Sequence, residues 1–115
     1  MSANCLFCKI AAQEIPSKAV YQDANYYAFQ DVNPVAPTHV LIVPRKHIPT
    51  LNDLQTWDEA LVGGMFTLAK KLAAQLNLAE SGYRIVFNCN KEAGQTVFHI
   101  HMHLLGGRPM KWPPG

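Results

Sequence analysis

Alternation between apolar and polar residues predicts several β-strands in the first half of the chain. The segments "AVYQD" and "YYAFQD" are rich in aromatic and β-branched residues and flank a turn at residues 23–25, so they predict two neighbouring strands. The stretch "NPVAP" is predicted to be a loop, because its prolines have no amide hydrogen to donate. "THVLIVPRKH" is almost entirely apolar, which favours a third strand at the centre of the sheet.

Two further strands are predicted near the C-terminal end, "YRIVFN" and "TVFHIHMHLL", the second covering residues 96–105. Side chains of a strand alternate between its two faces. His99, His101 and His103 therefore share one face, and the apolar residues between Ile100 and Leu104 share the other, which is the core side. We expect the histidine face to remain accessible.

Apolar residues that recur every three or four positions predict one long helix from Trp57 to about residue 77. Thr56 and Glu59 predict a capping box at its start, and Gly82 is predicted to close its exit. "LFCKIAA" predicts a short N-terminal helix. The pattern thus predicts an α+β fold, an antiparallel sheet of about five strands with the long helix on the face opposite the histidines.

The composition is that of an ordinary globular domain, and 115 residues predict one domain over residues 1–115. Residues 108–115 contain three prolines, so we expect an extended tail that docks on another surface. A net charge of +2 is too small to indicate nucleic-acid or membrane-surface binding. The sequence has no run of about 18 apolar residues that would predict a membrane span, and no signal-peptide pattern. We therefore expect a cytoplasmic protein.

Three imidazoles on one face leave three interpretations open. They are hydrogen-bonded structural residues, or metal ligands, or groups that act on phosphorus. As ligands, a pair suits one ion better than all three, because His99 and His103 would lie ~13 Å apart at Cα. As a nucleophile, a neutral imidazole of pKa ~6.5 forms a covalent phospho- or nucleotidyl-histidine, while its neighbours donate to phosphate or pass a proton. Gly94, Gln95 and Thr96 just before the strand offer close backbone approach, amide donors and a hydroxyl.

The motifs resemble those of the histidine-triad (HIT) family. "HIHMHLL" is similar to the family signature His-φ-His-φ-His-φ-φ, in which φ is apolar. "GGRPMKWPPG", "AFQDVNPVAPTHVLIVPRKHI" and "GYRIVFN" resemble the Hint branch, the histidine-triad nucleotide-binding proteins, in the same order. The resemblance covers residues 7–115. It implies a HIT-like fold that pairs with a second copy into a homodimer with a continuous ten-stranded sheet.

The resemblance also implies an enzyme that binds purine nucleotides and hydrolyses nucleoside phosphoramidates and acyl-adenylates. His101 would be the nucleophile on the α-phosphorus, and His103 and His39 would orient rings or hold phosphate. His99 would help Thr96 to protonate the leaving amine. Thr96 stands where the branch commonly has Ser, and its β-branch restricts the hydroxyl. The chemistry would need no cofactor.

The nucleotide-binding residues implied by the resemblance fall into four groups. They are Asn88 and Gln95 for phosphate, Asp31 for the ribose hydroxyls, Leu6, Phe7, Ile10, Phe29 and Val32 for the base, and Trp112 for the partner's active site. Without the resemblance, the same positions have ordinary interpretations as core, turn, strand-end or surface residues.

"CLFC" places Cys5 and Cys8 in a chain with three cysteines, which favours reduced thiols or a metal over a disulfide. Some relatives that this chain resembles bind zinc through such a pair, a remote histidine and the first triad histidine. Here those ligands would be Cys5, Cys8, His47 and His99, a sound tetrahedral set for a structural zinc. His99 would then be unable to shuttle protons, and the leaving group would rely on Thr96 or water.

The leading interpretation is therefore a purine nucleoside phosphoramidate and acyl-adenylate hydrolase. A nucleotide-binding or sensing module with incidental hydrolysis, a zinc-carrying structural protein and a dinucleoside polyphosphate hydrolase remain as alternatives. The "WPPG" ending argues against the last of these.

Overall fold

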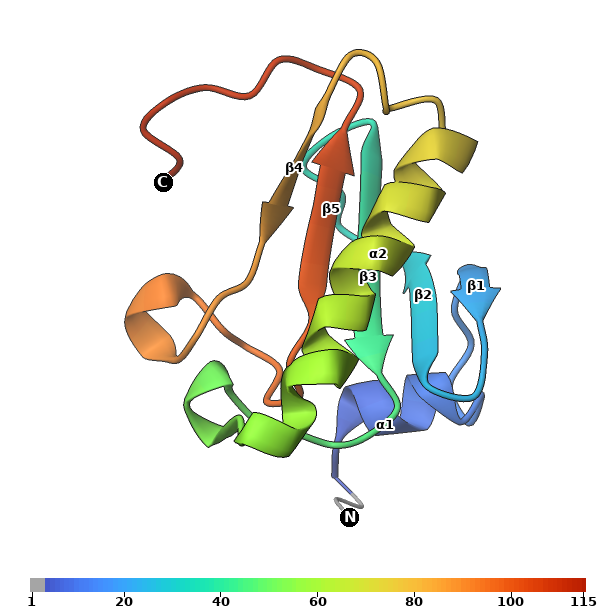
Figure 1. Cartoon of the computed structure of the whole chain (residues 1–115), viewed down its shortest axis with the longest axis vertical. Coiled ribbons are helices and arrows are strands. Elements are labelled where there is room, and N and C mark those ends of the chain that lie inside the picture. Colours follow the sequence, from blue (N-terminus) through green and yellow to red (C-terminus); the bar gives the residue numbers. More distant parts are fainter. Residues whose placement is uncertain (1–3) are drawn as a thin grey trace.

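Five antiparallel strands form one sheet in the computed structural model, which describes residues 4–115 (Figure 1). The strand order is β1-β2-β3-β5-β4, so β3 is central as predicted. The elements are α1 (Leu6–Ala11), β1 (Ala19–Gln22), β2 (Tyr26–Gln30), β3 (Thr38–Pro44), η1 (Leu51–Asp53), η2 (Thr56–Asp58), α2 (Glu59–Gln75), β4 (Tyr83–Val86), η3 (Lys91–Ala93) and β5 (Met102–Gly106). This confirms the predicted α+β fold. No helix of the described residues has the length and apolar character needed to cross a membrane.

The two faces of the sheet carry different layers. Helix α2 lies across one face (Figure 1), where Met65 and Leu72 of the helix pack with Ile42, Met102 and Leu104 of the strands. This confirms the predicted core side of β5. On the other face, α1 packs its buried residues against β2 and β3 in a second cluster that includes Phe7, Ile10, Phe29 and Leu41.

The register of β3 and β5 brings two histidines together. His39 pairs with Leu105, and Leu41 pairs with His103. Directly opposed residues of an antiparallel ladder share a face. His39 and His103 therefore lie diagonally across the two central strands, on the face that α2 does not cover.

The predicted strand 96–105 is wrong in its first half, because β5 begins only at Met102. Ile42 pairs with Met102, so two residues farther along the same ladder residue 100 would oppose Pro44. A proline has no amide hydrogen for a ladder bond. The segment before β5 instead turns away, and the amide of Ile100 donates to the carbonyl of Ile48 at 2.8 Å. His99 and His101 thus precede the strand.

The start of α2 also differs from the prediction. The Thr56–Glu59 capping box does not form, because the Asp58 carboxylate takes the capping role and accepts the amide of Gln55 at 3.0 Å. Asp58 is held there by Lys46, whose ammonium donates to it at 2.6 Å. Trp57 lies in the tighter turn η2, out of phase with the apolar stripe of α2, and it is 74% exposed.

The end of α2 is closed by Asn77 and not by Gly82. Asn77 has a left-handed φ of 63°, and the amide of Leu78 donates back to the carbonyl of Ala73 at 2.8 Å. This is the bond of a Schellman cap, in which Asn is the usual substitute for Gly. Gly82, with φ of 107°, serves the turn into β4.

Two neighbouring glycines of α2 provide a test of this packing. A side chain at Gly63 would meet nothing within 4 Å, whereas one at Gly64 would collide with the hydroxyl of Tyr26, which donates to the carbonyl of Leu61 at 2.7 Å. We expect Gly63→Ala to raise the free energy of unfolding by about 0.5–1 kcal/mol, the normal gain for a helical glycine. Gly64→Ala should lower it by about 1–2 kcal/mol, since Tyr26 must give up its hydrogen bond. Urea unfolding measures both, and two stabilising substitutions would contradict the packing.

Candidate active site

The five histidines of the chain form one continuous cluster, which we call the histidine cluster: His39, His47, His99, His101 and His103. The ring centroids of His47 and His99 are 5.2 Å apart, those of His101 and His103 are 5.0 Å apart, and those of His39 and His103 are 5.2 Å apart. The ring of His101 is joined to the carbonyl of His99 by a contact of 2.8 Å. Three separate segments supply the rings: β3, the loop after it, and the stretch from His99 into the start of β5.

The expectation of an accessible histidine face is wrong for His39, His99 and His101, and Phe7 of α1 covers the last two. His99 is completely buried, and His39 and His101 are only 7% and 9% exposed. The ring of Phe7 meets His101 edge-on with centroids 4.9 Å apart. Burial lowers the pKa of His101 below its ordinary value, and it lowers the pKa of His99 and of His103 to about 4. These three rings are therefore neutral at pH 7.

His101 has a defined direction for its proton. Its Nδ1 lies 2.8 Å from the carbonyl oxygen of His99, and a carbonyl oxygen can only accept. Nδ1 of the neutral ring therefore carries the hydrogen, and Nε2 keeps the lone pair. A neutral imidazole nitrogen with its lone pair free is the form that attacks an electrophile.

His103, His39 and Asp31 follow in a row. Nε2 of His39 lies 2.9 Å from Nδ1 of His103 and 3.3 Å from Oδ2 of Asp31. The other nitrogen of His39, Nδ1, accepts the amide of Val35 at 3.2 Å. Nε2 of His103 is buried and has no hydrogen-bond partner within residues 4–115. A buried polar atom without a partner is rare and needs an explanation.

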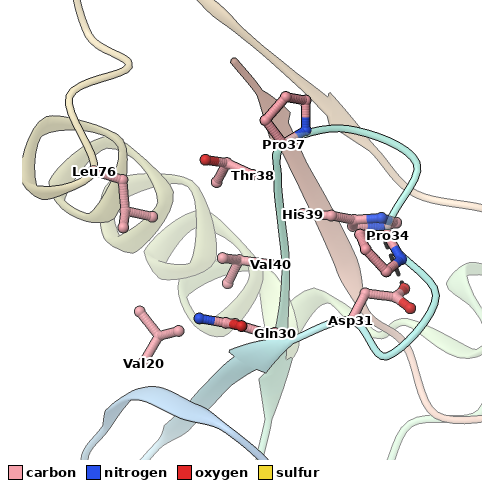
Figure 2. Close-up of a pocket in the computed structure, with 9 residues that line it drawn as sticks. All are labelled: Val20, Gln30, Asp31, Pro34, Pro37, Thr38, His39, Val40 and Leu76. Atoms are coloured by element: carbon pink, nitrogen blue, oxygen red, sulfur yellow. Dashed lines mark ion pairs between the residues drawn. The ribbon is translucent and has the colours of Figure 1, made fainter. Parts of the chain in front are cut away.

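Asp31 connects this row to two cavities. Figure 2 shows Asp31 and His39 beside Pro34 at one pocket, which has a volume of about 150 Å³. A larger cleft of about 530 Å³ also has Asp31 in its lining. That cleft is lined by Pro16, Ser17, Lys18, Gln30, Asp31, Val32 and Pro34. Oδ1 of Asp31 accepts the amide of Asn33 at 2.8 Å, so the carboxylate is held in place in the lining of both cavities.

The five residues expected to surround a purine base are partly buried and partly exposed in the structure. Phe7, Ile10 and Phe29 are buried and belong to the core beneath α1. Leu6 and Val32 are exposed, at 43% and 87%. Only the exposed pair offers apolar surface to a bound molecule without a rearrangement.

The loop before β5 uses Gln95 for its own structure. Its amide nitrogen donates to the carbonyls of Pro49 and Val97, and its amide oxygen accepts the amide of Asn90. Both amide hydrogens are therefore engaged, and the expected donation of this side chain to phosphate does not fit the chain as it stands. Thr96 is exposed and Asn88 is half-buried, so both can reach a ligand.

Trp112 of the C-terminal tail is 81% exposed and stands beside the edge strand β4, with the Arg84 guanidinium 5.7 Å from its ring centre. The tail has neither helix nor strand.

Two cysteines and two histidines form a possible metal site that shares His47 and His99 with the histidine cluster. Cys5, Cys8, His47 and His99 place four ligand atoms within 4.8 Å of one another. The contacts are 3.3 Å from Cys5 Sγ to His99 Nδ1, 3.4 Å from Cys8 Sγ to His47 Nδ1, and 3.2 Å between the two Nδ1 atoms. A tetrahedral zinc with Zn–S of ~2.3 Å and Zn–N of ~2.0 Å separates its ligands by roughly 3.3–3.8 Å. The four residues therefore fit a metal ion.

The tautomer of His99 supports the same conclusion. Its Nε2 lies 2.7 Å from the carbonyl oxygen of Pro44, so Nε2 carries the hydrogen and Nδ1 turns its lone pair towards the thiols. Metal-ligating histidines almost always donate their other N–H in this way. Burial and the adjacent Cys5 thiol raise the pKa of Cys8 to about 12 in the metal-free chain, and a cation that binds here displaces that proton.

Comparison with known proteins places this geometry in a family. The family model "HIT domain" matches residues 12–110. The chain belongs to the HIT family. It is 52% identical over 110 residues to a purine nucleoside phosphoramidase of Escherichia coli K12, and the match covers 96% of this chain and 92% of that protein.

Solved structures of HIT proteins agree with the fold. A HIT family hydrolase from Legionella pneumophila has 57% identity and a TM-score of 0.96, with 97% of this chain and 100% of that one covered. A histidine triad nucleotide-binding protein from Candida albicans has 34% identity and a TM-score of 0.82, with 96% and 83% covered.

Sequence reasoning missed the backbone groups of this HIT site. The carbonyls of His99 and Pro44 and the amide of Val35 set the direction of three rings. Backbone groups have no signature in the sequence. The contact between Asp31 and His39 was also missed, although the two residues flank the same short loop.

Proposed function

We propose that this HIT protein hydrolyses purine nucleoside phosphoramidates and acyl-adenylates through a nucleotidyl intermediate on His101. The observation that carries the proposal is the contact between His101 Nδ1 and the His99 carbonyl, which leaves Nε2 with a free lone pair. The 52% identity to a protein named purine nucleoside phosphoramidase supports the same substrate class.

The reaction has two displacements at the α-phosphorus. Nε2 of His101 attacks phosphorus and the bond from phosphorus to the leaving group breaks; an amine takes up a proton as it leaves, whereas an acyl group leaves as its carboxylate. Water then attacks phosphorus and releases a proton to solvent, the bond to His101 breaks, and the nucleoside monophosphate departs with the ring neutral again. One difficult displacement is thus replaced by two easier ones.

His103 would stabilise the phosphoryl oxygens. Its Nε2 is buried and has no partner in the described part of the chain, and its ring centre is 5.0 Å from that of His101. A donor held where negative charge increases lowers the barrier more than it strengthens substrate binding. His39 would act behind His103 by orienting it.

The proton for the leaving group would come from Thr96 or water and not from His99. Both ring nitrogens of His99 are engaged, one with the Pro44 carbonyl and the other with the cysteine centre. His99 is also completely buried. Thr96 is exposed, three residues before His99 in the chain, and carries a hydroxyl that can pass a proton.

The nucleoside would lie in the cleft beside Asp31, with the carboxylate accepting the ribose hydroxyls. Val32 and Leu6 would cover the base with exposed apolar surface, supported from below by the core residues Phe7, Ile10 and Phe29. Asn88 would contact phosphate. Lys18 lines the same cleft and adds positive charge near a nucleotide.

Replacing His101 tests the function. We expect His101→Ala to lower turnover of an adenosine 5′-phosphoramidate by roughly 10³-fold or more, because the covalent route is lost. AMP should still bind, since the Asp31 cleft is unchanged. Chromatography of released AMP measures turnover, and mass spectrometry of the quenched wild type should place an adenylyl group on the peptide with His101. Equal slow cleavage by both forms would favour a nucleotide-binding module whose hydrolysis is incidental.

We further propose that Cys5, Cys8, His47 and His99 hold a zinc ion with a structural role. When bound, the ion would fix the N-terminal segment to the histidine cluster.

The three cysteines of the chain are free thiols in the structure. Free thiols fit a reducing compartment, and we propose the cytoplasm.

The zinc proposal has a matched pair of variants. Metal analysis of the purified protein should give about one zinc per chain, a tightly held structural ion. Cys8→Ser should remove the zinc and lower the melting temperature, whereas Cys89→Ser should retain it, because Cys89 lies outside the four-residue group. A wild-type protein that is purified in the presence of zinc and contains almost none would contradict the proposal.

The protein is also proposed to form a homodimer through strand β4. Among residues 4–115 this strand pairs only with β5, so its outer edge has no strand beside it in the described chain. Apolar groups adjoin that edge: Tyr83 is 37% exposed, and Phe66 of α2 is 47% exposed with its ring 6.0 Å from that of Phe87. Two β4 edges joined antiparallel would extend the sheet to ten strands, and an open edge is the part of a sheet that recruits another chain. Trp112, beside β4, would then point towards the partner.

Phe66→Glu should therefore convert the dimer into a monomer, since a charge would be buried in the interface beside β4. Trp57→Glu is the matched control, because Trp57 is exposed but lies before α2, on η2. Sedimentation velocity distinguishes the two states. Dissociation by both substitutions, or by neither, would place the interface elsewhere.

A further inference from the structure

The loop between β2 and β3, residues 31–37, holds a backbone group against the histidine cluster. The amide of Val35 lies 3.2 Å from Nδ1 of His39. An amide N–H can only donate, so Nδ1 of His39 must keep its lone pair. The neutral ring of His39 therefore carries its hydrogen on Nε2. A second proton on Nδ1 would place two N–H groups against each other.

The same argument extends from His39 to His103. Nε2 of His39 carries a hydrogen and lies 2.9 Å from Nδ1 of His103. Oδ2 of Asp31, at 3.3 Å, is a second and more distant acceptor for that hydrogen. Whichever acceptor receives it, Nδ1 of His103 cannot also carry a hydrogen, because two N–H groups would then face each other. His103 must therefore carry its hydrogen on Nε2.

The hydrogen bonds from the Val35 amide to His39 and from His39 to His103 form a row that we call the relay. The relay ends at a buried nitrogen without a partner. Nε2 of His103 is the orphaned atom of the cluster within residues 4–115, and the relay makes it an N–H donor. The opposite tautomer would present a lone pair at the same place and would repel a phosphate oxygen. The direction of one backbone amide thus decides whether His103 attracts or repels the substrate.

We propose that Val35 is a positioning residue whose main-chain amide, acting through His39, fixes His103 as a donor to the substrate's phosphate. The proposal rests on the proposed function in one respect, that the group which accepts the Nε2–H of His103 is a substrate phosphate. The Val35 side chain is 60% exposed and is not needed. The peptide is held from its other side by the C-terminal tail, because the Arg108 guanidinium donates to the Val35 carbonyl at 3.0 and 3.2 Å.

The donor pattern also distinguishes this row from a metal site. Asp31, His39 and His103 lie within 4.8 Å of one another, close enough for an ion. A metal on Nε2 of His39 would move the ring hydrogen to Nδ1, where it would meet the amide of Val35. A ligating histidine donates its other N–H to an acceptor, as His99 does with Pro44. His39 faces a donor instead, so the row is arranged for hydrogen bonding.

The wild-type protein provides the first test, which does not depend on activity. Long-range ¹H–¹⁵N correlation of the ring nitrogens at pH 7 identifies the protonated nitrogen of each histidine. We expect Nε2–H for both His39 and His103, and Nδ1–H for His101. AMP should shift the Nε2–H signal of His103. An Nδ1–H tautomer at His39 or at His103 would overturn the relay even if the enzyme is active.

The second test removes the amide itself. Val35→Pro lacks the N–H, and Val35→Ala retains it. Relative to Val35→Ala, Val35→Pro should mix the tautomers of His39 and His103. It should also lower kcat on an adenosine phosphoramidate by about 10–100-fold with little change in KM, since the nucleoside contacts remain. Unmixed tautomers and equal kcat in the two variants would refute the proposal.

The two tests separate this inference from the proposed function. If the wild type hydrolyses no nucleotide phosphoramidate, the proposed function fails, and the ring nitrogens of the wild type still decide the relay. If Val35→Pro does not fold, the wild-type spectrum again decides it. Should turnover depend on His101 while His103 shows the opposite tautomer, the function stands and the relay is wrong.

Discussion

The contact between the His99 carbonyl and the His101 ring is the interaction on which the site depends. It holds the ring and fixes its hydrogen on Nδ1, over a distance of 2.8 Å. His99 can serve as this fixed point because it is completely buried and its own Nε2 is held by the Pro44 carbonyl. Pro44 therefore has two roles. Its missing amide hydrogen ends the ladder between β3 and β5, and its carbonyl anchors the segment that the ladder releases.

Burial on the α1 side makes this chemistry possible at neutral pH. Imidazoles in water are partly charged near pH 6.5, and several charged rings this close would repel one another. Removal from water lowers the pKa of His99 and His103 to about 4 and that of His101 below its ordinary value, so neutral rings can be packed together. The cost is that buried ring nitrogens need partners, and the backbone supplies one each to His99, His101 and His39. The sheet beneath, closed by α2 on its far face, keeps those backbone groups in place.

Much of this fold could be predicted from the sequence, because the apolar pattern of β2, β3 and α2 reflects which face of each element is buried. Met102 and Leu104 were placed correctly for the same reason. The errors arose where a distant residue decides a local structure. Strand β5 starts late because of Pro44, on another strand, and the capping box forms at η2 and not at α2, with the Asp58 carboxylate that Lys46 binds. The cover of α1 over the histidines and the internal bonds of Gln95 likewise depend on tertiary packing, which a residue pattern does not encode.

Three identical residues spaced two apart thus acquire three different tasks. Each ring has one nitrogen that meets a group of fixed polarity, and the other nitrogen is assigned by elimination. His99 donates to the Pro44 carbonyl, so its free lone pair faces the thiols of Cys5 and Cys8. His101 donates to the His99 carbonyl, so its free lone pair suits attack on phosphorus. His103 faces the N–H of His39, which leaves it a donor. The signature in the sequence specifies the rings, and the polarity of the groups that face them determines which nitrogen of each ring carries the hydrogen.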